Sequence, residues 1–176
     1  MPLIMGPNYP ISIYCLSADR TVGSVGTANQ TWFDSGSDAL QVLNTSLYLV
    51  EGFLHVTWGA TATIPYVSFG GTATVTSMRY WVASARSGSP TATNDAGGFV
   101  ATADESAVGT NIGQANLVVR LSGVLRTAAA GTFIPQYRAG TDTAGSHVVK
   151  ANSFFALYYL GTDNSTGALT TIGPWS

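Results

Sequence analysis

Two histidines are the side chains of this chain best suited to acid–base or metal chemistry near neutral pH. His55 and His147 lie far apart in the sequence, and neither belongs to an H-x-x-x-H or H-E-x-x-H motif that would direct two imidazoles at one metal ion. His55 lies within the apolar segment from Phe53 to Trp58. We therefore expect a partly buried imidazole that is hydrogen-bonded within a sheet or an interface, and no metal ligand.

Acidic residues form two short clusters. Asp104 and Glu105 are adjacent, so they would point to opposite faces of a strand, whereas glycoside hydrolysis requires two carboxyl groups that face each other across a bond. Asp34 and Asp38 flank Ser-Gly-Ser and could hold Ca²⁺ through their oxygen atoms, but the segment lacks the denser D-x-[DN]-x-[DN]-G pattern of a calcium loop. Asp, Ser and Gly are common turn residues, so we expect solvated turns at both places.

Two sequence motifs of catalysis and phosphate binding are absent. The chain contains no G-x-S-x-G nucleophile motif and no G-x-x-x-x-G-K-[ST] loop, since its single lysine is Lys150. A catalytic constellation can still be assembled from distant positions. The sequence nevertheless favours a protein that is not an enzyme and that takes no cofactor or metal.

Aromatic residues are the remaining candidates for a binding role. The four tryptophans, Trp32, Trp58, Trp81 and Trp175, and the eight tyrosines could form a flat platform for sugar rings. Aromatic residues also dominate protein cores and protein interfaces, and we prefer that interpretation here.

The composition indicates a neutral surface that suits permanent assembly. Charged residues are 9% of the 176 residues, against about 25% in a typical domain. The formal net charge is −2, and the six arginines are spread from Arg20 to Arg138, so no basic stripe for nucleic acid is expected. The single cysteine, Cys15, excludes an internal disulfide.

Neither a membrane span nor a secretion signal is expected. The first ten residues contain three prolines and no basic segment, and no apolar run reaches the roughly 18 residues that a transmembrane helix needs. We expect a soluble protein.

From Ser46 onward, short apolar segments alternate in hydrophobicity with a period of two residues and are separated by Gly, Pro, Asn and Asp. No segment has the periodicity of a helix. The segment from 114 to 126 places Leu117, Val119 and Leu121 on one face. The expected strands are 47–50, 52–58, 66–69, 72–75, 78–83, 99–103, 114–126, 132–137, 147–150 and 154–160.

The pattern predicts an all-β fold, a two-sheet antiparallel jelly-roll sandwich. The strand from Phe154 to Leu160 is apolar or aromatic on both faces, so we expect that it is covered on both sides. No repeat of fixed period is visible, which disfavours a propeller or a solenoid.

We interpret residues 1–40 as an extended N-terminal arm and residues 41–176 as the jelly-roll head. The arm is rich in Pro, Gly, Ser and Thr, and Ile11, Ile13, Tyr14 and Leu16 could add as one strand to the sheet edge of a capsid partner. The alternative is that this segment is a first strand on the same core, followed by a long loop.

The C-terminal half resembles virion proteins of tailed bacteriophages. The similarity is carried by residues 117–138, with the segment GTFIPQY from Gly131 to Tyr137, and by residues 148–161. Upstream, residues 48–53 and 61–69 resemble the opening strands of that family, and the whole resemblance covers about residues 46–161. The segment from Ser153 to Leu160 is also similar to the last strand of tumour-necrosis-factor-like and complement-like heads, which are trimeric jelly rolls, with Ala156 where many such heads have glycine.

This resemblance implies a homotrimer that decorates or cements a bacteriophage capsid by binding the major capsid protein, with no nucleic-acid or membrane partner. Such a protein is assembled in the host cytoplasm and lies on the outer surface of the virion. The alternative that the resemblance leaves open is a tail-fibre or receptor-binding head, which would recognise a host-surface glycan or protein through loops such as 84–98 and 140–146. The implied trimer-interface residues are Phe133, Tyr137, Phe154, Phe155, Leu157, Tyr158 and Tyr159.

Overall fold

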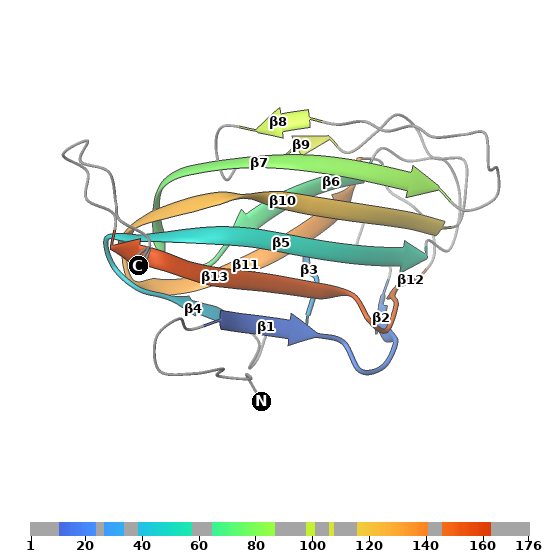
Figure 1. The fold of residues 1–176 in the computed structure, drawn as a ribbon. Helices are drawn as coiled ribbons and strands as arrows, with labels where there is room; N and C mark the ends of the chain where they lie inside the picture. Colours follow the sequence, from blue (N-terminus) through green and yellow to red (C-terminus); the bar gives the residue numbers. More distant parts are fainter. Residues whose placement is uncertain are drawn as a thin grey trace, which may run out of the picture.

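The computed structural model describes residues 11–23, 27–33, 39–57, 65–86, 98–100, 106–107, 116–140 and 146–162. All regular elements in these ranges are β-strands, which form two antiparallel sheets (Figure 1). The strands are β1 (Ile11–Cys15), β2 (Arg20–Val22), β3 (Gln30–Thr31), β4 (Leu40–Val42), β5 (Ser46–Thr57), β6 (Pro65–Gly70), β7 (Thr74–Arg86), β8 (Gly98–Val100), β9 (Ser106–Ala107), β10 (Asn116–Ala129), β11 (Gly131–Ala139), β12 (His147–Val149) and β13 (Phe154–Thr162).

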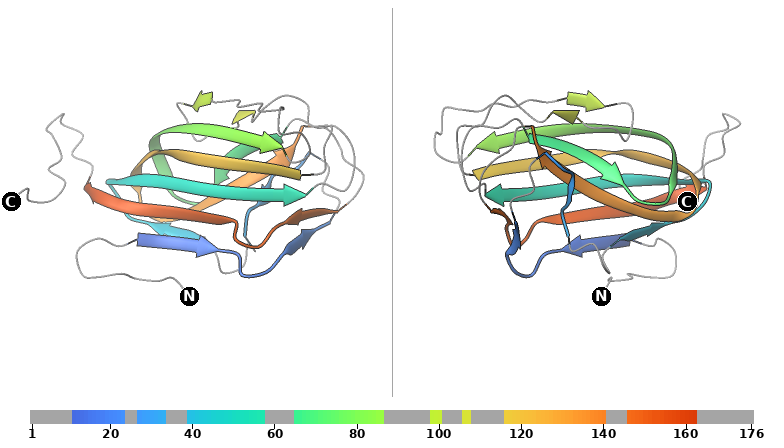
Figure 2. Two further views of the ribbon diagram at one scale, coloured as in Figure 1. Left: turned by 45° about the vertical axis from the view of Figure 1, so that its right-hand side comes forward. Right: turned by 180° about the vertical axis from the view of Figure 1, so that it is seen from behind.

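The two sheets differ in size and pack face to face. In the large sheet the strand order is β1-β13-β5-β10-β7-β8, and β12 joins β2 to β5. In the small sheet the order is β3-β11-β6-β9, with β4 paired to β11. Seen from behind, the small sheet lies in front of the large one, so the molecule is a two-layer sandwich (Figure 2). The prediction of an all-β jelly-roll sandwich is confirmed.

The core forms where the alternating strands turn their apolar residues inward. Buried and part-buried residues alternate along the whole of β5, and the same alternation runs through most of β11. The predicted inward face of β10 is confirmed, because Leu117, Val119 and Leu121 are buried. At the centre of the core, Phe155 contacts three aromatic rings, with centroids 5.6 Å from Trp32, 6.0 Å from Phe69 and 6.1 Å from Phe133.

Two strands extend across positions where the sequence predicts the end of one strand and the start of the next. Strand β5 runs unbroken through Gly52, where the prediction placed a boundary. A Cβ atom at Gly52 would lie 3.0 Å from atoms of both Trp32 and Phe155, so glycine is required there for close packing and not for a turn. Strand β7 begins at Thr74 and runs through Thr76 and Ser77, so it includes the end of the predicted strand 72–75 and the whole of the predicted strand 78–83.

The proposed boundary between an arm and a head at residue 40 needs correction. Strand β1 pairs with β13 in the register Ile11↔Tyr158, and β3 pairs with β11 of the small sheet. Trp32 is completely buried in the core. Residues 11–33 are thus part of the sandwich where they are described, as in the alternative interpretation, and residues 1–10 of the expected arm lie outside the described residues.

Polar contacts also hold the turn after β1 against the turn between β12 and β13. The Leu16 amide donates a hydrogen bond to the Ser153 carbonyl at 2.9 Å. Asp19 accepts a hydrogen bond from the Ala151 amide at 2.8 Å and forms an ion pair with Lys150, and together these contacts lower the pKa of the Asp19 carboxyl. The N-terminal strands are therefore tied to the C-terminal strands by both sheet pairing and side chains.

Candidate interaction surface

The side of the large sheet that faces away from the small sheet carries a row of large side chains, and we call this side the outer face. Its residues alternate with the core residues along β13, β5, β10 and β7. Cross-strand neighbours run in rows, one from Phe154 through Phe53 to Arg120 and another from Tyr158 through Leu49 to Val124 and Arg79. A third row connects Ile13, Ala156, Glu51, Ser122 and Trp81.

Three of the four exposed large apolar side chains of the described residues lie on the outer face. Ile13 is 37% exposed, Trp81 47% and Val124 38%, and the fourth, Leu43, lies between β4 and β5. They come from three different strands of the large sheet. The apolar character of the outer face is thus spread across its width and is not confined to one residue.

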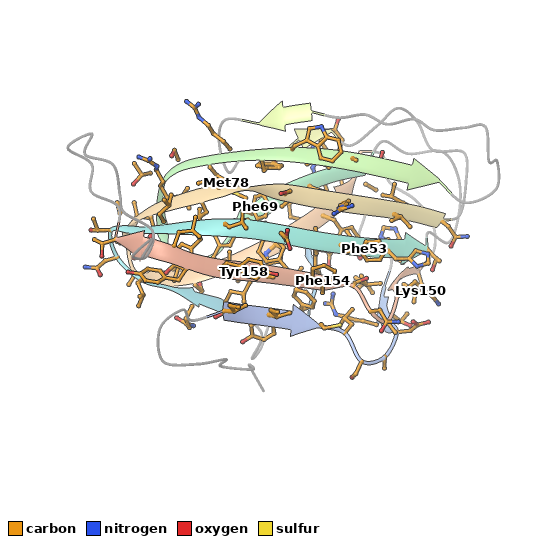
Figure 3. The ribbon with its side chains drawn as sticks, viewed as in Figure 1. Phe53, Phe69, Met78, Lys150, Phe154 and Tyr158 are labelled. Atoms are coloured by element: carbon orange, nitrogen blue, oxygen red, sulfur yellow. The ribbon has the colours of Figure 1, made fainter. Side chains whose placement is uncertain are left out.

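The β5 and β13 part of the outer face is aromatic. Phe53 and Phe154 are direct cross-strand neighbours, and their rings stack with centroids 6.3 Å apart and an interplanar angle of 14°. Figure 3 shows both with Tyr158 on these two adjacent strands. The Tyr158 hydroxyl donates a hydrogen bond to the Glu51 carboxylate at 3.3 Å. Partial burial, and secondarily the nearby carboxylate, raise the pKa of Tyr158, so its hydroxyl stays protonated near neutral pH.

The β7 and β10 part of the outer face is cationic. Arg79, Arg120 and Arg126 are exposed on these strands. A shallow hollow of about 390 Å³ is lined by Ser77, Arg79, Val124 and Arg126. A second hollow of about 290 Å³ lies at the boundary with the aromatic part, where Glu51, Phe53, Arg120, Ser122 and Phe154 line it together with the backbone beneath.

The outer side of the small sheet is different in character. There Arg138 lies over the ring of Tyr66, with its guanidinium carbon 4.0 Å from the ring centroid. Gln136 is the cross-strand neighbour of Ser68. None of the exposed large apolar side chains of the described residues belongs to the strands of the small sheet, so the large sheet offers the better surface for a protein partner.

The structure separates the seven sequence-predicted trimer-interface residues into two groups. Phe133, Tyr137, Phe155 and Leu157 are at most 1% exposed. Their side chains lie in the core of a single chain, where a second copy cannot contact them. The prediction that these four residues form a trimer interface is therefore corrected. Burial raises the pKa of the Tyr137 hydroxyl to about 12.

The other three predicted interface residues are partly accessible. Phe154 and Tyr158 lie on the outer face. Tyr159 points inward at the edge of the core and packs on Tyr48, with ring centroids 5.5 Å apart. Sequence reasoning missed Phe53 and Val124 as surface residues, although their alternation with Leu54 and Leu125 was a signal that could have found them.

The four predicted capsid-binding residues also divide between two sides of their strand. Ile11 and Ile13 lie on the outer face of β1, whereas Tyr14 and Leu16 pack against the core. One edge of β1 is already paired to β13 of the same chain. A sheet of another protein could therefore pair only with the opposite edge of this strand.

The described residues contain no group of three or more His, Cys, Asp or Glu side chains that could hold a metal ion. His55 lies on β5 and His147 on β12. The acidic residues Asp34, Asp38, Asp104 and Glu105 lie outside the described residues, as do Trp58 and Trp175. No helix in the described ranges is long and apolar enough to cross a membrane.

The burial of His147 leads us to predict that the stability of the fold depends on pH. This residue is fully buried, and desolvation lowers the pKa of its imidazole below 6.5. The unfolded chain takes up a proton at a higher pH than the folded chain, so the free energy of unfolding should fall as the pH decreases below 6.5. Urea denaturation at about pH 7.5 and pH 5.5 measures this loss. The loss of stability between these two pH values should be smaller in His147→Phe than in the unmodified protein, and the same in His55→Gln as in the unmodified protein. An equal loss in the unmodified protein and both variants would contradict the assignment of this pH dependence to His147.

The fold defines the chain as an all-β protein with two antiparallel sheets in a jelly-roll sandwich. No protein-family model matches the sequence, and no curated protein sequence is significantly similar to it. Among solved structures, the Eiger TNF of S. frugiperda is similar at 11% identity over 93% of this chain and 100% of that chain, with a TM-score of 0.35. A bacterial lipoprotein of Bacteroides thetaiotaomicron is similar at 8% identity over 90% and 92% of the two chains, with a TM-score of 0.25. These values assign no family to the chain.

Proposed function

We propose that the protein is a structural component of a virion without enzymatic activity, a capsid decoration or cement protein of a tailed bacteriophage that associates as a homotrimer. The observation that supports this most directly is the outer face of the large sheet. It exposes Trp81, Val124 and Ile13 on a chain in which charged residues are only 9%. A face that combines exposed aromatic, apolar and arginine side chains has the composition that is typical of protein interfaces.

The place in a phage capsid is supported by the sequence resemblance of residues 117–138 and 148–161 to virion proteins of tailed phages. These residues form most of β10, β11, β12 and β13. They supply part of both sheets and half of the outer face. In this proposal the large sheets of three copies face one another, and other surfaces of the trimer bind the major capsid protein.

Two measurements test this function. Light scattering of the purified protein at micromolar concentration should give three times the chain mass of 18.3 kDa. Electron microscopy of particles labelled for this protein should show the label distributed over the shell lattice. A stable monomer would contradict the association, and a label confined to the tail tip would contradict the place in the capsid.

Trp81→Ser should weaken association by about 30-fold or more, because buried tryptophans contribute about 2 kcal/mol or more at interfaces where they are central. The matched control is Leu43→Ser, which removes a side chain that is 52% exposed but lies outside the outer face. Sedimentation equilibrium measures both dissociation constants. If Leu43→Ser dissociates the assembly and Trp81→Ser does not, the interface lies elsewhere.

A tail-fibre or receptor-binding head is the second candidate, and one observation favours it. The hollow of about 290 Å³ combines the stacked rings of Phe53 and Phe154 with the polar groups of Glu51, Arg120 and Ser122. Apolar rings beside convergent polar groups suit a sugar ring as well as a protein. The loop segments first expected to recognise a glycan, 84–98 and 140–146, fall largely outside the described residues. Binding of the purified protein to host cells rather than to shells would favour this candidate.

A further inference from the structure

The outer face consists of two halves with complementary chemistry. We call the part on β1, β13 and β5 the acidic-aromatic half, with Ile11, Ile13, Glu51, Phe53, Phe154 and Tyr158. The part on β7 and β10 is the basic half, with Ser77, Arg79, Trp81, Arg120, Val124 and Arg126. Glu51 is the single carboxylate among these residues, whereas the basic half carries three guanidinium groups.

Glu51 needs a counter-charge if this face is covered. It lies at the centre of the third row, between Ala156, which is buried, and Ser122, which is exposed. Within its own chain it accepts a hydrogen bond from Tyr158. No salt bridge joins Glu51 to Arg79 or Arg120 in the part of the chain that the structure describes. A carboxylate that loses water without gaining a cation is strongly unfavourable in an interface.

The basic half offers such a counter-charge. Arg79 and Arg126 line the same hollow of about 390 Å³, which is open to the outside and has Val124 between them. Guanidinium groups bind carboxylates with directed, charge-assisted hydrogen bonds. The exposed indole of Trp81, two residues after Arg79 on the same face of β7, can pack on aromatic rings such as Phe53 and Phe154 of another copy.

We infer that the outer face docks a second copy of this chain, with the acidic-aromatic half of one copy on the basic half of the next. Glu51 enters the hollow between Arg79 and Arg126 of the neighbouring copy. This inference rests on the proposed self-association and specifies its contacts. In a trimer each copy gives one half of its outer face to each neighbour, and the contact between two different halves closes into a ring.

Charge reversal tests the pairing. Glu51→Arg, and separately the double variant Arg79→Glu/Arg126→Glu, place like charges opposite each other and should each raise the dissociation constant of the trimer by about 30-fold or more. The triple variant Glu51→Arg/Arg79→Glu/Arg126→Glu exchanges the charges of the two contacting sites, so that opposite charges face each other again. It should restore association close to that of the unmodified protein. Arg138→Glu is the control, because it reverses the charge of one arginine on the small sheet, outside the outer face.

The readouts are sedimentation equilibrium and, for each variant, thermal unfolding to confirm the fold. If Glu51→Arg and the double variant both form trimers with the affinity of the unmodified protein, the pairing is overturned. The proposed self-association would then still stand. A triple variant that is folded but remains dissociated would also overturn the pairing. A monomeric unmodified protein would contradict both the pairing and the proposed trimer, so the two failures are distinguishable.

Discussion

Phe155→Ala should lower the free energy of unfolding by about 3–5 kcal/mol. The Phe155 side chain is completely buried and lies against Trp32, Phe69 and Phe133. Its removal leaves a cavity between the two sheets at the point where both contribute aromatic rings. Urea denaturation followed by tryptophan fluorescence measures the loss, at one fixed protein concentration so that association does not alter the comparison.

Phe154→Ala is the matched control, since it removes the same side chain one residue earlier. Phe154 faces the other side of β13 and stacks on Phe53 at the surface. We expect a loss below about 1.5 kcal/mol in the unfolding of an isolated chain, together with weaker association. Equal destabilisation by the two substitutions would mean that the large sheet is covered on both sides within one chain.

Gly71→Ala should produce the second large loss of stability. Gly71 has a φ of 115°, a conformation that costs other residues about 1–3 kcal/mol. A Cβ atom there would lie 2.1 Å from the Thr132 carbonyl oxygen. That oxygen accepts a hydrogen bond from the Ala73 amide at 3.0 Å, so the backbone cannot move away without breaking the bond. Relief of the overlap adds roughly another 1–3 kcal/mol.

Gly70→Ala separates this backbone effect from the general effect of an added methyl group. A Cβ atom at Gly70 would meet the Gln136 side chain, with 2.8 Å to its amide nitrogen. That amide is the end of a flexible side chain and can rotate away. Thermal unfolding should therefore show a much smaller change for Gly70→Ala than for Gly71→Ala, and the reverse order would contradict the described turn between β6 and β7.

The sequence predicts the fold class correctly because alternation with a period of two residues is a local signal. In β10, alternation alone identifies Leu117, Val119 and Leu121 as core residues. The pairing of β1 with β13 has no such signal. It depends on residues at opposite ends of the described chain, so Ile11 and Ile13 were interpreted as part of a separate arm.

The interaction surface is harder to predict for a related reason. In β13 both faces are apolar, and Phe154 and Phe155 are identical in type, so alternation cannot tell which of them faces the core. That distinction comes from the pairing with β5, where Gly52 leaves room for the Phe155 ring beside Trp32. Local sequence indicated that the strand is apolar on both faces, and the neighbouring strands decide which residues reach the surface.

The pairing of β1 with β13 also sets a condition on the order of synthesis and assembly. Strand β1 is made before its partner in the sheet, Phe154–Thr162, which leaves the ribosome after the other strands of the described residues. Such distant pairing closes late and slowly during folding. Ile11 and Ile13 cannot join the acidic-aromatic half until then. In the docking that we infer, copies of the chain would therefore acquire a complete docking surface only after β13 has been released.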